Sequence, residues 1–275
     1  MHIVTDSHFE IGKTHLVCED YACHGEEPVP YVIVADGCSS ASDADVGARL
    51  LALNARKLLP AFIRSDPNIP AAVHHRQLGH RVMQPAIEQA ADLGLDSSTP
   101  DTTLIVAFVA EERIRVHVYG DGCLVGKRRD GTLRIVHIEF AQNAPYYLSY
   151  AEDWERQQAY GDIMSYQEIP QRVSTIDRGM VKAETRNFDE PGLFEFDLNE
   201  FPLVAIATDG LDSLTNVVSG VQLKLAEAAN QFMTFENTNG DFVKRRLRRM
   251  LINYAKESIY NLDDVGCGVF ACIDD

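Results

Sequence analysis

Hydrophobic and polar residues follow two periodicities that alternate along the chain. Short runs rich in β-branched and aromatic residues predict buried or half-buried strands. Such runs occupy residues 31–35, 103–109, 114–119, 133–138, 203–207 and 265–273. The connections at 110–113 and 129–132 are far shorter than the roughly dozen residues that a parallel crossover needs. The middle of the chain is therefore expected to be an antiparallel meander.

Helical periodicity lies between and after these strands. Apolar residues recur every three to four positions in residues 45–63, 71–95, 221–233 and 242–258. In the second of these helices Pro85 predicts a break, because an interior proline lacks the N–H that the helix needs. Strands that alternate with pairs of helices indicate an α+β fold in which helix layers pack on sheets.

The segment 141–200 shows neither periodicity. It is rich in Tyr, Gln and acidic residues, and we expect a long irregular insertion with one short helix around residues 153–160. Irregular segments of this length inside a compact domain often carry function. The sequence shows no internal repeat, linker or low-complexity segment, so we expect a single domain over residues 1–275.

Composition and charge narrow the classes of function. The 275 residues are 45% apolar, which suffices for one sizeable core. The chain has 41 acidic and 25 basic residues, and its formal charge is −16. A protein with this charge repels nucleic-acid backbones and anionic membrane surfaces, so we expect no nucleic acid and no membrane among its partners.

The sequence also bears on location. Residues 1–10 lack the apolar run of a secretory signal, and no stretch approaches the roughly 20 apolar residues of a membrane-spanning helix. The six cysteines include no CxxC pair and indicate reduced thiols. We therefore expect a cytoplasmic protein, whose oligomeric state the sequence leaves open.

Acidic residues stand at the ends of several predicted strands. Asp36, Asp121 and Asp209 follow strands, each beside a glycine, and Asp263 with Asp264 precedes the last strand. In an antiparallel sheet the end of one strand lies beside the start of its neighbour. All of these carboxylates can therefore share one edge.

Two interpretations of these acidic residues remain open from spacing alone. Asp-Gly pairs are common in turns, and this explains any one of these aspartates taken singly. Four strand-end acids at one edge would repel one another unless a cation neutralised them. A set of oxygen donors without His or Cys ligand spacing favours Mg²⁺ or Mn²⁺ over Zn²⁺.

Six short motifs occur in an order that resembles a known family. They are CEDYA at 18–22, VIVADG at 32–37, DTT at 101–103, YGDG at 119–122, ATDG at 207–210 and DDV at 263–265. Their order and spacing are similar to those of the metal-dependent protein phosphatases of the type 2C class, over about residues 12–273. The resemblance implies a four-layer α-β-β-α sandwich with two central antiparallel sheets, in which residues 141–200 occupy the flap region.

The same resemblance implies a dinuclear Mg²⁺ or Mn²⁺ centre. Asp36, Asp209 and Asp263 would ligate the two ions, with the carbonyl oxygen of Gly37 as a further ligand. Asp264 stays open as an alternative to Asp263, which we favour because the last strand begins two residues after it.

Three more acids receive roles from the resemblance. Glu19 and Asp20 would hold metal-bound waters, and Asp121 with Asp209 would form a third, weaker metal site. The implied activity is that of a protein serine/threonine phosphatase, which hydrolyses phosphomonoesters with an activated water and needs no Ser or Cys nucleophile. The implied partner is a phosphorylated protein.

The substrate-binding position departs from the family pattern. The family usually has an arginine five residues before the motif aspartate, where this chain has His15. A histidine can contact phosphate, but as a single donor that is only partly charged at pH 7. Lys13 would lie on the same face if the segment were a strand, and it could supply the missing charge. A weak or inactive regulatory module and a hydrolase of small phosphoesters therefore remain alternatives.

Two other groups of residues receive ordinary structural interpretations. His74, His75 and His80 lie on a predicted helix without acidic partners at ligand spacing, and we expect a surface position or a helix end. The basic run at 244–249 alternates with apolar residues, so we expect an amphipathic helix with a solvated basic face.

Overall fold

Two large antiparallel sheets form the centre of the protein, for which the computed structural model describes residues 2–65 and 69–273. The seven-stranded sheet has the strand order β1 (His2–Glu10), β15 (Val265–Ile273), β11 (Leu203–Ala207), β6 (Gly122–Lys127), β7 (Leu133–Phe140), β8 (Gln171–Asp177) and β9 (Met180–Arg186). The five-stranded sheet has the order β10 (Gly192–Asp197), β5 (Arg113–Tyr119), β4 (Thr102–Ala110), β3 (Tyr31–Gly37) and β2 (Asp20–Gly25). A small sheet has the order β13 (Val221–Gln222), β12 (Leu214–Asn216) and β14 (Ile259–Asn261).

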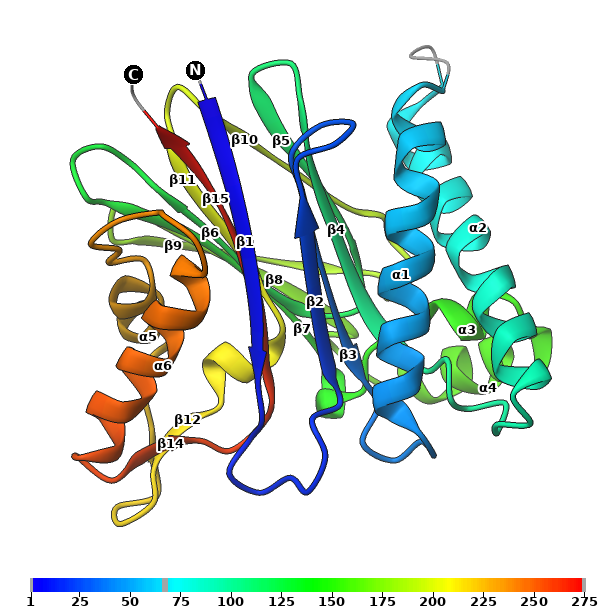
Figure 1. Cartoon of the computed structure of the whole chain (residues 1–275). Coiled ribbons are helices and arrows are strands. Elements are labelled where there is room, and N and C mark those ends of the chain that lie inside the picture. The colour runs from blue at the N-terminus through cyan, green and yellow to red at the C-terminus, as the bar shows by residue number, and fades with distance from the viewer. Residues whose placement is uncertain (1, 66–68, 274–275) are drawn as a thin grey trace.

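Helices cover the outer faces of both large sheets. The helices are α1 (Ala44–Ile63), α2 (Ala71–Asp92), α3 (Leu148–Ala151), α4 (Trp154–Met164), α5 (Leu225–Phe232) and α6 (Phe242–Ala255), with short 3₁₀ turns η1 (Ala141–Asn143) and η2 (Asp209–Asp212). Helices α1 and α2 lie on one side of the paired sheets, and α5 and α6 lie on the other (Figure 1). The predicted four-layer α-β-β-α sandwich is confirmed.

The alternating side chains of the strands explain these layers. In β3, Val32 and Val34 point into the core between the two sheets, where Phe270 of β15 also packs. Ile33 and Ala35 point the other way, into the core beneath α1 and α2. Because successive side chains of a strand alternate between its faces, a strand that is apolar at every position belongs between two buried layers.

The helix predictions need two corrections. Pro85 does not break α2, which runs through it from Ala71 to Asp92. A proline removes one backbone hydrogen bond, but the neighbouring Val82, Met83 and Ala86 are fully buried beneath the helix and hold it on the sheet. The predicted helix at 221–233 begins only at Leu225, because residues 221–222 pair with β12.

The segment 141–200 is not irregular as expected. It contains the predicted short helix as α4, but also the strands β8, β9 and β10. Strands β8 and β9 extend the seven-stranded sheet, and β10 forms the edge of the five-stranded sheet beside β5. The prediction was wrong because β9 is almost wholly exposed, and an exposed strand carries no apolar alternation.

The N-terminal residues also form an unpredicted strand. Strand β1 pairs with β15 over its whole length, although it contains two histidines and two acids. Its buried Asp6 accepts the backbone N–H of Val243 at 2.6 Å, which ties α6 to this edge of the sheet. All six cysteines are free thiols. Within residues 2–65 and 69–273, no helix has both the length and the hydropathy required to cross a bilayer.

Candidate functional site

Five aspartates from both large sheets gather at one end of the sandwich. Asp20 begins β2 and lies opposite Asp36 near the end of β3. Asp121 occupies the turn between β5 and β6, Asp209 follows β11, and Asp263 precedes β15. The carboxylate of Asp36 interacts electrostatically with those of all four others, so the expected common edge is present.

Burial makes this cluster electrostatically costly. Asp20 and Asp121 are buried, whereas Asp36, Asp209 and Asp263 are partly exposed. Burial first, and then the neighbouring carboxylates, raise the pKa of Asp36 well above its usual value. The same two causes raise the pKa of Asp121, with Asp209 as its strongest neighbour. A folded protein tolerates such a cluster when protons or cations neutralise it.

The carboxylate of Asp20 has one oxygen without a partner. Its Oδ2 accepts the hydroxyl of Thr208 at 2.8 Å, and Thr208 in turn accepts the backbone N–H of Gly266 at 2.9 Å. Its Oδ1 is buried and has no hydrogen-bond partner within the described residues. An orphaned carboxylate oxygen among other carboxylates fits a hard divalent cation, which takes oxygen ligands.

Glycines allow the backbone to place these aspartates. Gly120 and Gly122 flank Asp121 with φ of 98° and 134°, a range that L side chains rarely adopt. Gly210 follows Asp209, and a Cβ at this position would stand 1.6 Å from the carbonyl oxygen of Asp264. The Asp-Gly pairs therefore form tight turns and also position the aspartate side chains at the site.

Asp263 and Asp264 have different surroundings. Asp264 is buried and accepts the backbone N–H of Gly12 at 2.6 Å and of Glu19 at 2.5 Å, so it anchors the loop between β1 and β2. Asp263 raises the pKa of Asp36, Asp121 and Asp209 through its charge. Asp264 likewise raises the pKa of Asp20, so the choice of Asp263 over Asp264 as a ligand stays a prediction.

The loop 11–19 holds the two predicted phosphate contacts. It is not a strand, so Lys13 and His15 do not share a strand face. The ammonium of Lys13 lies 5.3 Å from the ring centroid of Tyr260. His15 lies between two carboxylates, with Nε2 at 3.4 Å from Asp263 Oδ1 and Nδ1 at 3.1 Å from Asp264 Oδ2.

Glu19 and Gly37 meet at the same end of the five-stranded sheet. The backbone N–H of Gly37 donates to the carbonyl oxygen of Glu19 at 3.2 Å. Burial raises the pKa of the Glu19 carboxyl, which also lies near the charges of Asp263 and Asp264. Beyond Gly37, the thiol of Cys38 lies 3.1 Å from the hydroxyl of Ser40.

The sequence did not reveal how segment 141–200 is joined to the site. Arg156 of α4 pairs with the buried Asp101, and Ser149 of α3 donates to the same carboxylate at 2.6 Å. The carbonyl oxygen of Asp101 accepts the backbone N–H of Cys38 at 2.9 Å, two residues after Asp36. The ion pair links residues far apart in the chain, and no spacing in the sequence signals such a contact.

Another residue beside the cluster was also missed. Asp212 ends the η2 turn that Asp209 begins, and its charge raises the pKa of Asp209. Its Oδ2 lies 3.9 Å from Nε2 of His137 on β7. In the sequence, the two acidic residues spaced three apart in DGLD could have indicated that Asp212 lies near Asp209.

The histidines of α2 do not all lie on the surface. His75 is buried, where its ring stacks on Tyr119 with centroids 4.2 Å apart. Its Nδ1 lies 3.2 Å from Nδ1 of the buried His117 on β5. The surface prediction was wrong for His75, because the face of α2 that carries it packs on the five-stranded sheet.

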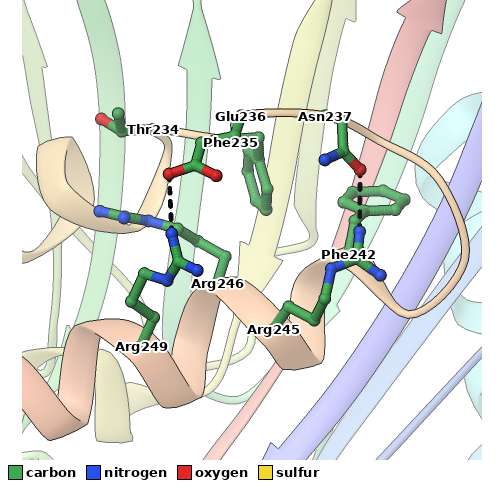
Figure 2. Close-up of a pocket in the computed structure, with 8 residues that line it drawn as sticks. All are labelled: Thr234, Phe235, Glu236, Asn237, Phe242, Arg245, Arg246 and Arg249. Atoms are coloured by element: carbon green, nitrogen blue, oxygen red, sulfur yellow. Dashed lines mark hydrogen bonds and ion pairs between the residues drawn. The ribbon is translucent and has the colours of Figure 1, made fainter.

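The basic run at 244–249 lies on α6, as predicted. Val243, Leu247 and Met250 are buried beneath this helix. Figure 2 shows arginines of its other face extending toward the segment 234–237, where Arg249 pairs with Glu236 at 2.7 Å and Arg245 donates to Asn237 at 2.9 Å. These arginines brace a surface loop.

Comparisons with known proteins agree with this geometry. The sequence matches the family model described as protein phosphatase 2C over residues 11–252. A search of curated protein sequences finds no match.

Solved structures share the fold at low sequence identity. A bacterial serine phosphatase is 13% identical with a TM-score of 0.57, and the alignment covers 100% of this chain and 99% of that chain. The serine/threonine phosphatase of S. agalactiae is 13% identical with a TM-score of 0.57, over 99% of this chain and 100% of that chain. Stp1 from Staphylococcus aureus is 13% identical with a TM-score of 0.56, over 100% and 96% respectively. At these identities the likeness shows the fold.

Proposed function

The chain belongs to the protein phosphatase 2C family, and from that premise we propose that it is a metal-dependent phosphatase of phosphoserine and phosphothreonine in proteins. The observation that carries the proposal is the cluster of Asp20, Asp36, Asp121, Asp209 and Asp263 at one end of both sheets. Its raised pKa values and its orphaned Asp20 oxygen both indicate a place for positive charge.

The residues of the cluster suit a centre of Mg²⁺ or Mn²⁺. Asp36, Asp209 and Asp263 would hold two ions together with the carbonyl oxygen of Gly37, because these groups offer the oxygen donors that such ions prefer. Divalent cations in two-ion sites lower the pKa of water and neutralise phosphoryl oxygens during displacement.

The remaining acids would have supporting roles. Asp20 and Glu19 would orient water at the centre, since each has an acceptor oxygen at the end of β2. Asp121 would contribute with Asp209 to a third, weaker site, as the charge coupling between these two carboxylates supports.

Partial exposure gives a substrate access to the cluster. Asp36, Asp209 and Asp263 are partly exposed to solvent, whereas Asp20 and Asp121 are buried. Cys38 has its thiol beside Ser40 and is given no role as a nucleophile. The proposed substrate, a phosphorylated protein, would therefore react with water and form no covalent intermediate with the chain.

The predicted phosphate contacts of His15 and Lys13 receive little support from the geometry. Both ring nitrogens of His15 lie beside carboxylates. Burial lowers the pKa of the ring, but the neighbouring Asp264, Asp263 and Glu19 together raise it above its usual value. Lys13 lies beside Tyr260. Both roles remain predictions.

The experiment that tests the proposal is a turnover assay with controlled metal. Purified protein is stripped with EDTA, and Mn²⁺ or Mg²⁺ is restored before a phosphoserine peptide, a phosphothreonine peptide or p-nitrophenyl phosphate is added. Turnover of the peptides that depends on metal is the expected result. Turnover of small phosphoesters alone would indicate a small-molecule hydrolase instead.

A catalytically weak regulatory module is a second candidate, favoured by His15 in the arginine position of the family. The discriminating variant is His15→Arg, with circular dichroism to show that it folds. A large gain in peptide turnover would identify a phosphatase of reduced activity. No turnover in either form, with Mn²⁺ bound, would favour the module.

A further inference from the structure

The loop 11–19 and the residue before β15 together offer a second set of potential metal ligands beside the aspartate cluster. His15, Glu19 and Asp264 each offer one ligand atom, and these three atoms lie within 4.8 Å of one another. The set combines an imidazole nitrogen with two carboxylate oxygens. Asp264 is buried, whereas His15 and Glu19 are partly exposed, so an ion has access from solvent.

The imidazole of His15 is already oriented toward Asp264. Its Nδ1 lies 3.1 Å from Asp264 Oδ2. This nitrogen is shielded from solvent, and within the described residues no hydrogen bond of acceptable geometry satisfies it. A buried polar atom without a hydrogen bond costs free energy, and a metal ion at Nδ1 would remove that cost.

Asp264 is held in place and keeps free acceptor capacity. The backbone N–H of Gly12 donates to Oδ1, and the backbone N–H of Glu19 donates to Oδ2. Each carboxylate oxygen has about two acceptor positions. The second position of Oδ2 faces His15 Nδ1 at 3.1 Å, so an ion bound between these two atoms would use it. Hydrogen bonds of this kind fix the orientation of a carboxylate that binds a metal.

The other ring nitrogen of His15 also has a suitable neighbour. Nε2 lies 3.4 Å from Asp263 Oδ1. With Nδ1 bound to an ion, the ring proton would be on Nε2 and would point at this carboxylate. Histidine ligands of metal ions are commonly oriented in this way by a carboxylate.

We propose that His15, Glu19 and Asp264 bind one divalent transition-metal ion, with Mn²⁺ preferred over Mg²⁺. Imidazole nitrogen is a good ligand for first-row transition metals, whereas Mg²⁺ favours oxygen ligands and water. The thiol of the nearby Cys18 donates to the carbonyl oxygen of Asp20 at 3.8 Å, and Cys18 is not assigned to the site.

This ion is separate from those assigned to the cluster of Asp36, Asp209 and Asp263, and its binding does not rest on phosphatase activity. It gives His15 the role of a metal ligand, in place of the phosphate contact predicted from the sequence. It also gives Glu19 this role, in place of the contact with water at the dinuclear centre, where Asp20 alone would then orient water. Asp263 lies between the two sites, which therefore share a border.

Pulsed electron paramagnetic resonance with Mn²⁺ as the probe tests the site directly. A nitrogen ligand on Mn²⁺ produces a ¹⁴N modulation, which we expect in the wild type and not in His15→Gln. The matched control is His137→Gln, because His137 also lies beside a carboxylate, that of Asp212. This control should keep the modulation, and excess Mg²⁺ should not remove it.

Affinity provides the second measurement. Titration of free Mn²⁺ should show binding at this site at least about tenfold weaker in Glu19→Gln as well as in His15→Gln, with both variants folded by circular dichroism. Wild-type protein that binds Mn²⁺ without ¹⁴N modulation, or His15→Gln that retains it, would overturn the proposal.

The variant Asp209→Asn separates the two sites. It removes a ligand assigned to the dinuclear centre, and the ¹⁴N modulation should persist in it. Loss of the modulation would mean that His15 serves the dinuclear centre, which contradicts a separate ion. If the ¹⁴N modulation is present but no phosphatase turnover is found, the metal site is supported and the proposed function is not. If turnover is found without the modulation, the proposed function is supported and this metal site is contradicted.

Discussion

Asp20 of β2 and Asp36 of β3 lie directly opposite each other in the antiparallel ladder that joins these strands. Like charges in this position destabilise a sheet, because the two side chains stand on the same face about 5 Å apart. Here Asp20 is buried and Asp36 is partly exposed, and the charges of Asp209 and Asp121 lie close to Asp36. The fold therefore holds together groups that repel one another, which is typical of a site organised for a cation.

The first prediction concerns stability without metal. Asp36→Asn removes a carboxyl whose raised pKa makes its ionisation unfavourable in the folded state, so in EDTA at pH 7 it should raise the free energy of unfolding by about 1–2 kcal/mol. For a chain of this size that corresponds to a Tm increase of about 2–4 °C per kcal/mol. Differential scanning calorimetry measures the change. The exposed Asp162→Asn is the matched control and should change stability by less than about 0.5 kcal/mol.

With Mn²⁺ added, the wild type should become more stable than Asp36→Asn. An ion that binds only the folded state stabilises it by about 2.7 kcal/mol at a concentration of 100 times its Kd. The wild type should gain more than Asp36→Asn, because the variant lacks a proposed ligand. Equal gains in both proteins would contradict a role of Asp36 in binding the ion.

The second prediction concerns activity. Asp209→Asn should lower the metal-dependent turnover of phosphopeptides at least about a hundredfold, because it removes a proposed ligand of the centre. The fold should remain intact, since the change relieves repulsion among buried carboxylates. Turnover is measured at saturating Mn²⁺, with the circular dichroism spectrum recorded in parallel. Unfolding of the variant would instead indicate a structural role for Asp209.

The third prediction concerns acid stability and the histidine pair His75 and His117. Burial first, with further contributions from nearby cationic or titratable groups, lowers the pKa of each to about 3. In the unfolded chain the pKa is about 6.5, so between these values the unfolded state binds more protons. The stabilising contribution is complete above about pH 6.5 and is lost as the pH falls toward 3.

Urea unfolding of the wild type and His117→Gln between pH 6.5 and 4.5 measures this contribution. The variant lacks one of the two groups, so the slope of its unfolding free energy against pH should be smaller by up to about 1.4 kcal/mol per pH unit. Variants are compared because the clustered aspartates have raised pKa values and therefore change the unfolding free energy with pH in the opposite direction. His2→Gln, on the exposed start of β1, should keep the wild-type slope.

The fourth prediction concerns the anchor of segment 141–200. Arg156→Met leaves the buried Asp101 with Ser149 as its side-chain donor, so stability should fall by about 1–3 kcal/mol. Limited proteolysis should then cut within residues 141–165 sooner than in the wild type. Arg113→Met breaks an exposed pair with Glu195 and should cost less than about 1 kcal/mol. Equal effects of the two variants would argue against a special role for Arg156.

Much of the fold was predictable because its strands are buried on both faces. In β3 and β4 nearly every residue is apolar, which leaves little doubt about a strand between two packed layers. The aspartates could be located for a related reason, since they interrupt these apolar runs at their ends.

The parts that escaped prediction depend on contacts between distant residues. Strand β9 is exposed and polar, and only its pairing with β8 defines it. The burial of His75 on α2 depends on the packing of this helix against β5, which carries His117. The different surroundings of Asp263 and Asp264 arise from the loop 11–19, roughly 250 residues earlier in the chain.

The origin of the aspartates in two different sheets has a mechanical consequence. Asp20 and Asp36 belong to strands of the five-stranded sheet, whereas Asp209 and Asp263 flank strands of the seven-stranded sheet. The gap between the two pairs is therefore set by the thickness of the apolar layer that includes Val34 and Phe270. We therefore expect a substitution in that layer to change the spacing of the proposed ligands, and with it the radius of the ion that they would prefer, without altering any of these ligands.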